Sequence, residues 1–157
     1  MDIYALKERF EQLETPFYYY DTDLLDRTLD EARRYAALIP TAEIHFAVKA
    51  NANAVILRHV RDAGFGADCV SGGEIERCLE VGIPANKIVY AGVGKTDREI
   101  RLGIERGILC FNVESLPEIE IIDQLAAEQQ KTARIALRIN PNIDAHTHKN
   151  ITTGLEE

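Results

Sequence analysis

Short β-prone runs alternate with helix-like runs at a nearly constant interval along this chain of 157 residues. The runs cover 43–50, 65–71, 87–92, 109–115 and 133–141, so their starts are 22, 22, 22 and 24 residues apart. The segments between them carry apolar residues at helical spacing. This alternation is typical of parallel strands joined by crossover helices, and it predicts an α/β protein built on a parallel sheet.

The boundaries of the expected helices are marked by capping residues. A serine or threonine directly follows each of three strands and precedes a glutamate by three residues, at Ser71, Thr96 and Ser115. Glycines stand where the helices should end, at Gly64, Gly82 and Gly107. The order strand, cap, helix, glycine and next strand therefore supports the parallel arrangement.

Two architectures fit this pattern, a (β/α)8 TIM-type barrel and an open doubly wound sheet. In the strand 43–50, Phe46 and Val48 share an apolar face, whereas Ala47 and Lys49 share a small or polar face. An open sheet covered by helices on both sides should be apolar on both faces. We therefore expect a barrel, of which this chain holds about the first five strand-helix units.

We divide the chain into a lead-in segment, residues 1–42, and a partial barrel domain, residues 43–157. The lead-in contains an expected strand, FYYYD (17–21), and an expected helix over about 22–38. A complete barrel has about 250 residues. We therefore expect the chain to be the first part of a longer protein.

The composition limits the classes of partner. Hydrophobic residues make up 46% and charged residues 28%, as in ordinary globular proteins, and the net charge of −8 disfavours nucleic acid and anionic membrane surfaces. No run has the length of a membrane span, and the first residues lack the apolar stretch of a signal peptide. Cys69, Cys78 and Cys110 form no C-x-x-C pair, so we expect free thiols and a cytoplasmic location.

Four polar residues, Lys49, Asp68, Glu114 and Arg138, lie near the C-terminal ends of expected strands, where barrel active sites gather. Lys49 is either a lysine that extends its amine into solvent or an amine held in a partly apolar opening, where a lowered pKa would let it form a Schiff base. Asp68 is either a functional acid or a turn residue. Arg138 is either a ligand-binding group or an exposed charge at a strand end.

Two stretches resemble phosphate-binding motifs but fit strand-to-helix turns better. GVGKT (92–96) lacks the glycine that a phosphate loop requires five residues before Gly94, because that position is Val89. SGGE (71–74) does not extend to G-x-G-x-x-G. An open-sheet nucleotide binder therefore has no motif to support it.

The pair His146 and His148, in the sequence HTH, raises the question of a metal site. Two histidines one residue apart without a third ligand make a weak site, and we expect no metal. A loop that packs near the opening of the site is the better interpretation.

The stretches FAVKAN, GFGADCVSGGEIERCLEVG and YAGVGKT together resemble the barrel domain of the alanine racemase-like (fold type III) pyridoxal-phosphate enzymes. The later stretch RINPNIDAHTHKNITTG resembles the diaminopimelate decarboxylases of that family. The resemblance covers about residues 15–157. Because FAVKAN continues as ANAVIL rather than with an aromatic-glycine turn, the alanine racemases themselves are less similar.

This resemblance implies roles for the candidate residues. Lys49 would be the catalytic lysine that carries pyridoxal 5′-phosphate through a Schiff base. Asp68 matches an acidic position near that lysine, and Arg138 matches an arginine of the cofactor pocket. His146 is included among the cofactor-binding residues.

The resemblance also implies an activity, the decarboxylation of meso-2,6-diaminopimelate to L-lysine and CO2 in lysine biosynthesis. The alternatives are a decarboxylase of another basic amino acid or carboxylated polyamine (ornithine, arginine or carboxynorspermidine) and a non-catalytic pyridoxal-phosphate barrel. The family implies a second β domain, with which the lead-in is associated, and a homodimer with a shared active site. We expect these 157 residues alone to be inactive.

Overall fold

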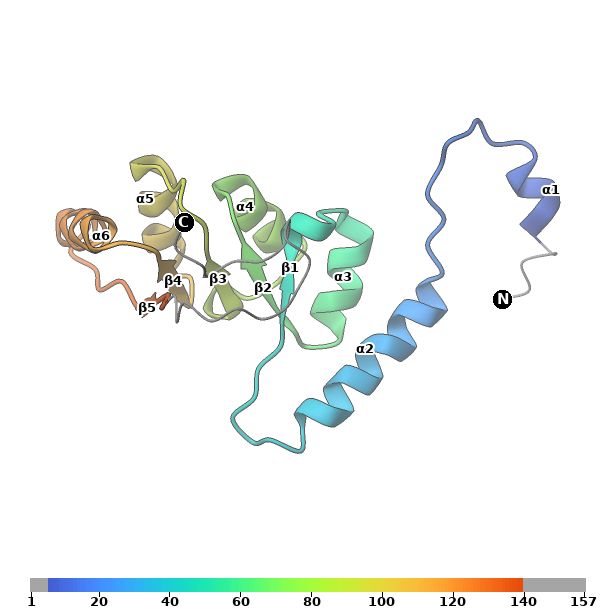
Figure 1. Cartoon of the computed structure of the whole chain (residues 1–157), viewed down its shortest axis with the longest axis horizontal. Coiled ribbons are helices and arrows are strands. Elements are labelled where there is room, and N and C mark those ends of the chain that lie inside the picture. Colours follow the sequence, from blue (N-terminus) through green and yellow to red (C-terminus); the bar gives the residue numbers. More distant parts are fainter. Residues whose placement is uncertain (1–5, 140–157) are drawn as a thin grey trace, which may run out of the picture.

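A computed structural model describes residues 6–139 of the chain as a five-stranded parallel sheet with helices (Figure 1). The strands are β1 (His45–Ala47), β2 (Gly66–Cys69), β3 (Ile88–Tyr90), β4 (Cys110–Val113) and β5 (Ile135–Leu137). Their order in the sheet is the order in the sequence, and every neighbouring pair is parallel. A doubly wound sheet would reverse its strand order part-way, and this sheet does not.

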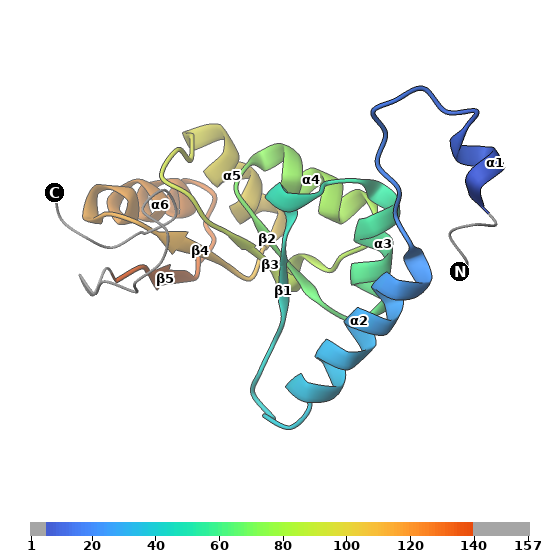
Figure 2. The ribbon, with the colours of Figure 1, turned by 45° about the vertical axis from the view of Figure 1, so that its right-hand side comes forward.

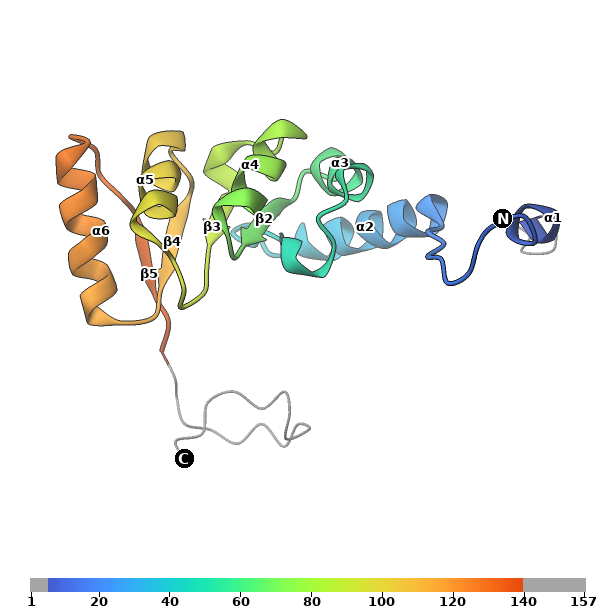
Figure 3. The ribbon, with the colours of Figure 1, turned by 90° about the horizontal axis from the view of Figure 1, so that it is seen from above.

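The helices that follow the strands lie on one side of the sheet. The helical elements are α1 (Lys7–Phe10), α2 (Thr22–Ala36), η2 (Val48–Ala50), α3 (Ala54–Asp62), α4 (Gly72–Glu80), η3 (Ala85–Lys87), α5 (Asp97–Arg106) and α6 (Leu116–Glu128). Figure 3 shows α3 to α6 in a row along the same side of the sheet. Sequential strands with all crossover helices on one side are consecutive units of a (β/α)8 barrel, and the expected fold class is confirmed.

The alternation of side chains separates a core face from an open face. Residues on the helix side of the strands, among them Val48, Ala67 and Phe111, are almost fully buried in one hydrophobic cluster with α3 to α6. The opposite face carries Asp68, which lies next to Ala47 of β1 in the register. This open face corresponds to the inside of a barrel, and it is the face on which polar strand-end residues were expected.

The capping prediction is confirmed at all three helices. The side chains of Ser71, Thr96 and Ser115 accept hydrogen bonds from the backbone N–H three residues later. At Thr96 the capping box is complete, because Glu99 also accepts from the Thr96 backbone. Gly107 ends α5 with φ of 68°, a left-handed conformation that glycine adopts without steric cost.

Helix α2 joins the barrel units through α3, as Figure 2 shows. Leu29 of α2, Val60 of α3 and Phe65 form a second small core. His59 Nδ1 lies 2.6 Å from Asp26 Oδ1 and adds a polar contact between the two helices. The expected helix over about 22–38 is thus confirmed, and it ends at Ala36.

One sequence expectation about strands needs correction. The strands have three or four residues each and are shorter than the β-prone runs. The segment 17–21 forms no strand within residues 6–139, and its expected pairing with a second β domain stays a prediction. The sequence analysis did not predict α1. Its residue Phe10 contacts Phe17 and Tyr19 of this segment, with ring centroids 5.4 and 5.2 Å apart.

The helix-facing side of β5 is exposed, in contrast with the other strands. Ile135, Leu137 and Ile139 have exposed fractions of 40%, 63% and 80%. Ile135 borders Ile119 and Ile122 of α6 at a hollow of about 230 Å³, so α6 covers this side of β5 only in part. We also find no helix among residues 6–139 that is long and apolar enough to cross a membrane.

Candidate active site

The polar residues of the open face form two groups at the C-terminal ends of the strands. Lys49 follows β1 and Asp68 lies in β2, whereas Glu114 and Arg138 follow β4 and β5. Because β1 and β5 are the two edges of the sheet, the groups lie at opposite ends of the row. In a closed barrel the ends of such a row curve toward each other around a common opening.

Lys49 lies in the short helix η2, directly after β1, where the sequence expectation put it at a strand end. Its neighbour Val48 is completely buried, which fixes the backbone of this turn against the core. The Lys49 side chain is exposed, and no described residue forms a hydrogen bond or ion pair with its amine. The sheltered, partly apolar surroundings expected for Lys49 are therefore not formed by residues 6–139.

Asp68 points away from the helix layer, between the buried residues Ala67 and Cys69 of β2. One of its carboxylate oxygens, Oδ1, is buried and has no hydrogen-bond partner among the described residues. Buried carboxylate oxygens are rarely left without a donor, because the loss of hydration is costly. Asp68 is thus a strand residue and not a turn residue, and its Oδ1 lacks a donor within residues 6–139.

Glu114 and Arg138 form an ion pair at the other end of the row. Nη1 of Arg138 donates to both carboxylate oxygens of Glu114, at 3.0 and 3.2 Å. The side chain of Glu114 is 13% exposed and that of Arg138 is 58% exposed. They line a hollow of about 370 Å³ together with Ala91, Asn112, Ala136 and Leu137.

Lys95 is a buried charge that the sequence analysis did not single out. It lies in the GVGKT turn between β3 and α5, and its side chain is only 1% exposed. Its amine donates to Glu118 of α6 at 2.6 Å. The signal in the sequence was a lysine directly before one helix cap, with Glu118 three residues after the cap of the next helix.

The candidate residues are therefore only partly brought together. Lys49 lies near Asp68, because η2 contacts β2, and Arg138 lies against Glu114. The hollow at Arg138 includes neither Lys49 nor Asp68. His146 and His148 lie outside the described residues.

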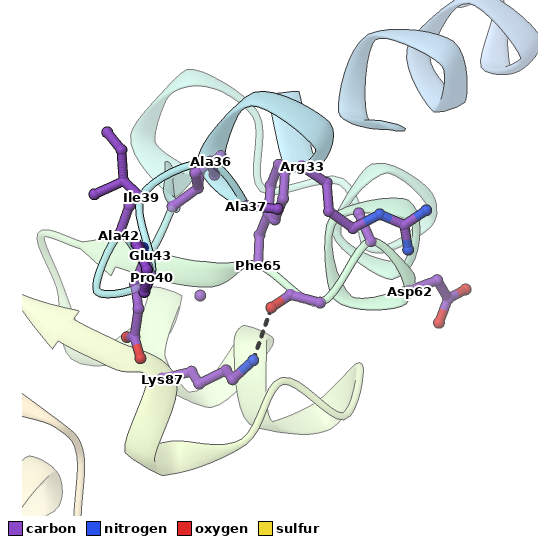
Figure 4. A pocket seen from close by; sticks show the side chains of 14 residues that line it. Arg33, Ala36, Ala37, Ile39, Pro40, Ala42, Glu43, Asp62, Phe65 and Lys87 are labelled. Carbon is purple, nitrogen blue, oxygen red and sulfur yellow. Dashed lines mark hydrogen bonds between the residues drawn. The ribbon is translucent and has the colours of Figure 1, made fainter. Parts of the chain in front are cut away.

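A larger hollow, about 550 Å³, lies at the N-terminal ends of the strands (Figure 4). Its charged residues are Arg33, Glu43, Asp62 and Lys87, two of each sign. The amine of Lys87 donates to the backbone oxygen of Gly64 at 2.8 Å, which ties two loops together. Residues at this end of barrel strands contribute mainly to stability, so we do not assign chemistry to this hollow.

The comparison with protein families identifies the family of this chain. The sequence model of the pyridoxal-binding domain of pyridoxal-dependent decarboxylases matches residues 25–157. The chain belongs to this family. The match includes all four strand-end residues, Lys49, Asp68, Glu114 and Arg138.

Two relatives whose sequences are similar to this chain are diaminopimelate decarboxylases. One from Bacteroides thetaiotaomicron is 59% identical over 150 residues, which are 96% of this chain and 39% of that protein. One from Aquifex aeolicus is 40% identical over 98% of this chain and 36% of its own length. The chain thus spans less than two-fifths of the length of these relatives.

Solved structures of two decarboxylases are also similar to this chain. The crystal structure of diaminopimelate decarboxylase from Helicobacter pylori complexed with L-lysine matches with a TM-score of 0.83 and 42% identity, covering 96% of this chain and 38% of that one. The lysine/ornithine decarboxylase from Vibrio vulnificus complexed with putrescine matches with a TM-score of 0.72 and 26% identity, covering 87% and 36%.

The strand-end residues suit pyridoxal 5′-phosphate, the cofactor of this family. An aldehyde cofactor needs a primary amine for attachment, and Lys49 offers one at the end of β1. The unpartnered Oδ1 of Asp68 on the neighbouring strand can accept a hydrogen bond from a bound molecule. Arg138 supplies an exposed cation paired with Glu114 at one nitrogen. The residues present therefore fit the cofactor.

Proposed function

We propose that these 157 residues form the lysine-bearing part of a pyridoxal-phosphate-dependent decarboxylase that converts meso-2,6-diaminopimelate to L-lysine and CO2. The observation that carries this proposal is the 59% identity with a diaminopimelate decarboxylase across 96% of the chain. The chain spans 39% of that relative. The activity is accordingly proposed for the whole protein, and we expect the 157 residues alone to be inactive.

Three residues have roles in this proposal. The amine of Lys49 attaches the cofactor and is the group placed to exchange a proton with the substrate. Asp68 would accept a hydrogen bond from the bound cofactor or substrate, and Arg138 would donate one to the cofactor. When bound, pyridoxal 5′-phosphate supplies the electron sink for the loss of the carboxyl group.

The whole protein with added pyridoxal 5′-phosphate tests the substrate assignment. Release of CO2 and formation of the amine product are measured with meso-2,6-diaminopimelate, ornithine, arginine and carboxynorspermidine in parallel. We expect lysine from diaminopimelate, with kcat/KM at least about a hundredfold above that for the other substrates, because a site built around a second polar end group rejects analogues that leave its groups unpaired.

Two outcomes would contradict the proposal. A preference for ornithine, arginine or the polyamine would assign the protein to a sister activity. Cofactor binding without CO2 release from any of the four substrates would make it a non-catalytic pyridoxal-phosphate protein.

We further propose that residues 1–42 connect the barrel with a β domain, that the whole protein is a homodimer with a shared active site, and that it is cytoplasmic. The first two proposals rest on the family resemblance. The location is supported by Cys69, Cys78 and Cys110, which are free thiols. The Sγ atoms of Cys69 and Cys78 lie 3.8 Å apart in the core without a disulfide.

A further inference from the structure

A buried ammonium group ties together the C-terminal ends of β3 and β4. Nζ of Lys95 donates to the backbone oxygens of Gly92 and Asn112, at 2.7 and 2.8 Å, and to Oε1 of Glu118 at 2.6 Å. These three acceptors use all three N–H groups of the amine. Lys95 is thus fully hydrogen-bonded in a place where a lysine without partners would be strongly unfavourable.

The same contacts continue to the residue that binds Arg138. The second oxygen of Glu118, Oε2, accepts from the backbone N–H of Glu114 at 2.8 Å. The Glu114 carboxylate accepts in turn from the N–H of Gly92 at 3.3 Å and from Arg138. The backbone and the side chain of Glu114 are therefore both fixed by groups that Lys95 holds.

Glu114 contacts only one nitrogen of the Arg138 guanidinium group. Both of its oxygens accept from Nη1. The Nε and Nη2 groups of Arg138 have no hydrogen-bond partner within residues 6–139, and 58% of the side chain is exposed. Glu114 therefore restrains Arg138 at one nitrogen and leaves its other donors available.

We propose that Lys95, Glu118 and Glu114 are positioning residues that hold Arg138 in the direction in which it binds the cofactor. The inference rests on the proposed function, because it assigns Arg138 to the pyridoxal-phosphate site. Its test is cofactor affinity, which does not depend on turnover.

The first experiment is a double-mutant cycle with Glu114→Gln and Arg138→Gln in the whole protein. The dissociation constant for pyridoxal 5′-phosphate is measured by absorbance titration, and thermal unfolding confirms that each variant is folded. Each single substitution should weaken binding about tenfold. The double variant should bind as weakly as Arg138→Gln alone, since Glu114 acts through Arg138.

The second experiment removes the buried charges together, because Lys95→Met alone would leave Glu118 without a partner. Lys95→Met with Glu118→Gln should weaken cofactor binding about three- to tenfold and add nothing in the Arg138→Gln background. The matched control, Arg101→Met with Glu128→Gln, removes an exposed ion pair between α5 and α6 and should leave binding unchanged.

Three results would overturn the inference. In the first, the losses of affinity from Glu114→Gln and Arg138→Gln multiply to about a hundredfold in the double variant. In the others, affinity is unchanged in Glu114→Gln or in the Lys95/Glu118 double variant. A wild-type protein that binds no pyridoxal 5′-phosphate would instead refute the proposed function.

Discussion

At the scale of single residues, Lys95 illustrates how a charge can be stable inside the fold. Burial of an ammonium group is tolerated when an ion pair and hydrogen bonds replace its hydration, and Lys95 has one carboxylate and two backbone oxygens as partners. Its removal leaves the Glu118 carboxylate, which is 13% exposed, without its cation. The stability of this turn therefore depends on both members of the pair.

Lys95→Met is expected to lower the free energy of unfolding by about 3 kcal/mol, because it strands a buried carboxylate. Urea unfolding followed by circular dichroism measures the loss. Arg77→Met is the control, since Arg77 and Glu80 form an exposed ion pair on α4 that contributes little. Equal effects of the two substitutions would show that Lys95 is not stabilised by the buried pair.

At the scale of elements, Glu99 connects two neighbouring helices. Oε1 accepts from the N–H of Gly72 at the start of α4, at 2.9 Å, and Oε2 accepts from the backbone and hydroxyl of Thr96. The hydrogen bond from Gly72, together with those from Thr96, lowers the pKa of Glu99 to about 2 from its ordinary value of 4.5. Burial raises the pKa of Tyr90, and the charge of the Glu99 carboxylate raises it further.

Glu99→Gln should therefore destabilise the protein in a pH-dependent way. The charged form is favoured in the folded state, so its contribution is complete above pH 4.5 and is lost as the pH falls through about 2. The difference in unfolding free energy between wild type and variant should be about 1 kcal/mol or more at pH 7 and should be smaller at pH 3. A difference that is constant over this range would contradict the assignment.

Helix α5 packs against β4 at a glycine. A Cβ atom at Gly103 would lie 2.8 Å from the ring of Phe111 and 3.0 Å from Ile108. Gly103→Ala should therefore lower the free energy of unfolding by about 1–3 kcal/mol through overpacking. Gly73→Ala on α4 is the matched control, because a Cβ there meets only Ser71 Oγ, at 3.9 Å, and thermal unfolding should show no loss.

The elements also mark what the sequence could predict. Caps such as Thr96 with Glu99 depend on residues three positions apart, and they were predicted correctly. Strand pairing depends on neighbours far along the chain, so the state of the β-prone segment 17–21, which forms no strand within residues 6–139, could not be decided from its own residues. Lys95 escaped notice for the same reason, since its partners Asn112 and Glu118 lie 17 and 23 residues away.

At the scale of the whole molecule, the regular interval of strands and helices predicted the barrel units. In every unit from β1 to β4, the strand is followed by a helix that packs on the same face of the sheet. The alternation of side chains predicted polar residues at the strand ends of the opposite face, and Asp68 and the Glu114–Arg138 pair lie there, while their part in a site stays a prediction. The surroundings of Lys49 could not be predicted, because they depend on groups beyond its own strand and turn. In the described residues this amine is exposed.

The attachment site of the cofactor tests the account most directly. The whole protein is incubated with pyridoxal 5′-phosphate, reduced with borohydride, digested and analysed by mass spectrometry, with Lys49→Ala in parallel. We predict a pyridoxyl group on Lys49 and none in the variant. Bound cofactor that is fixed on another lysine, or a reducible attachment that persists in Lys49→Ala, would contradict the assignment.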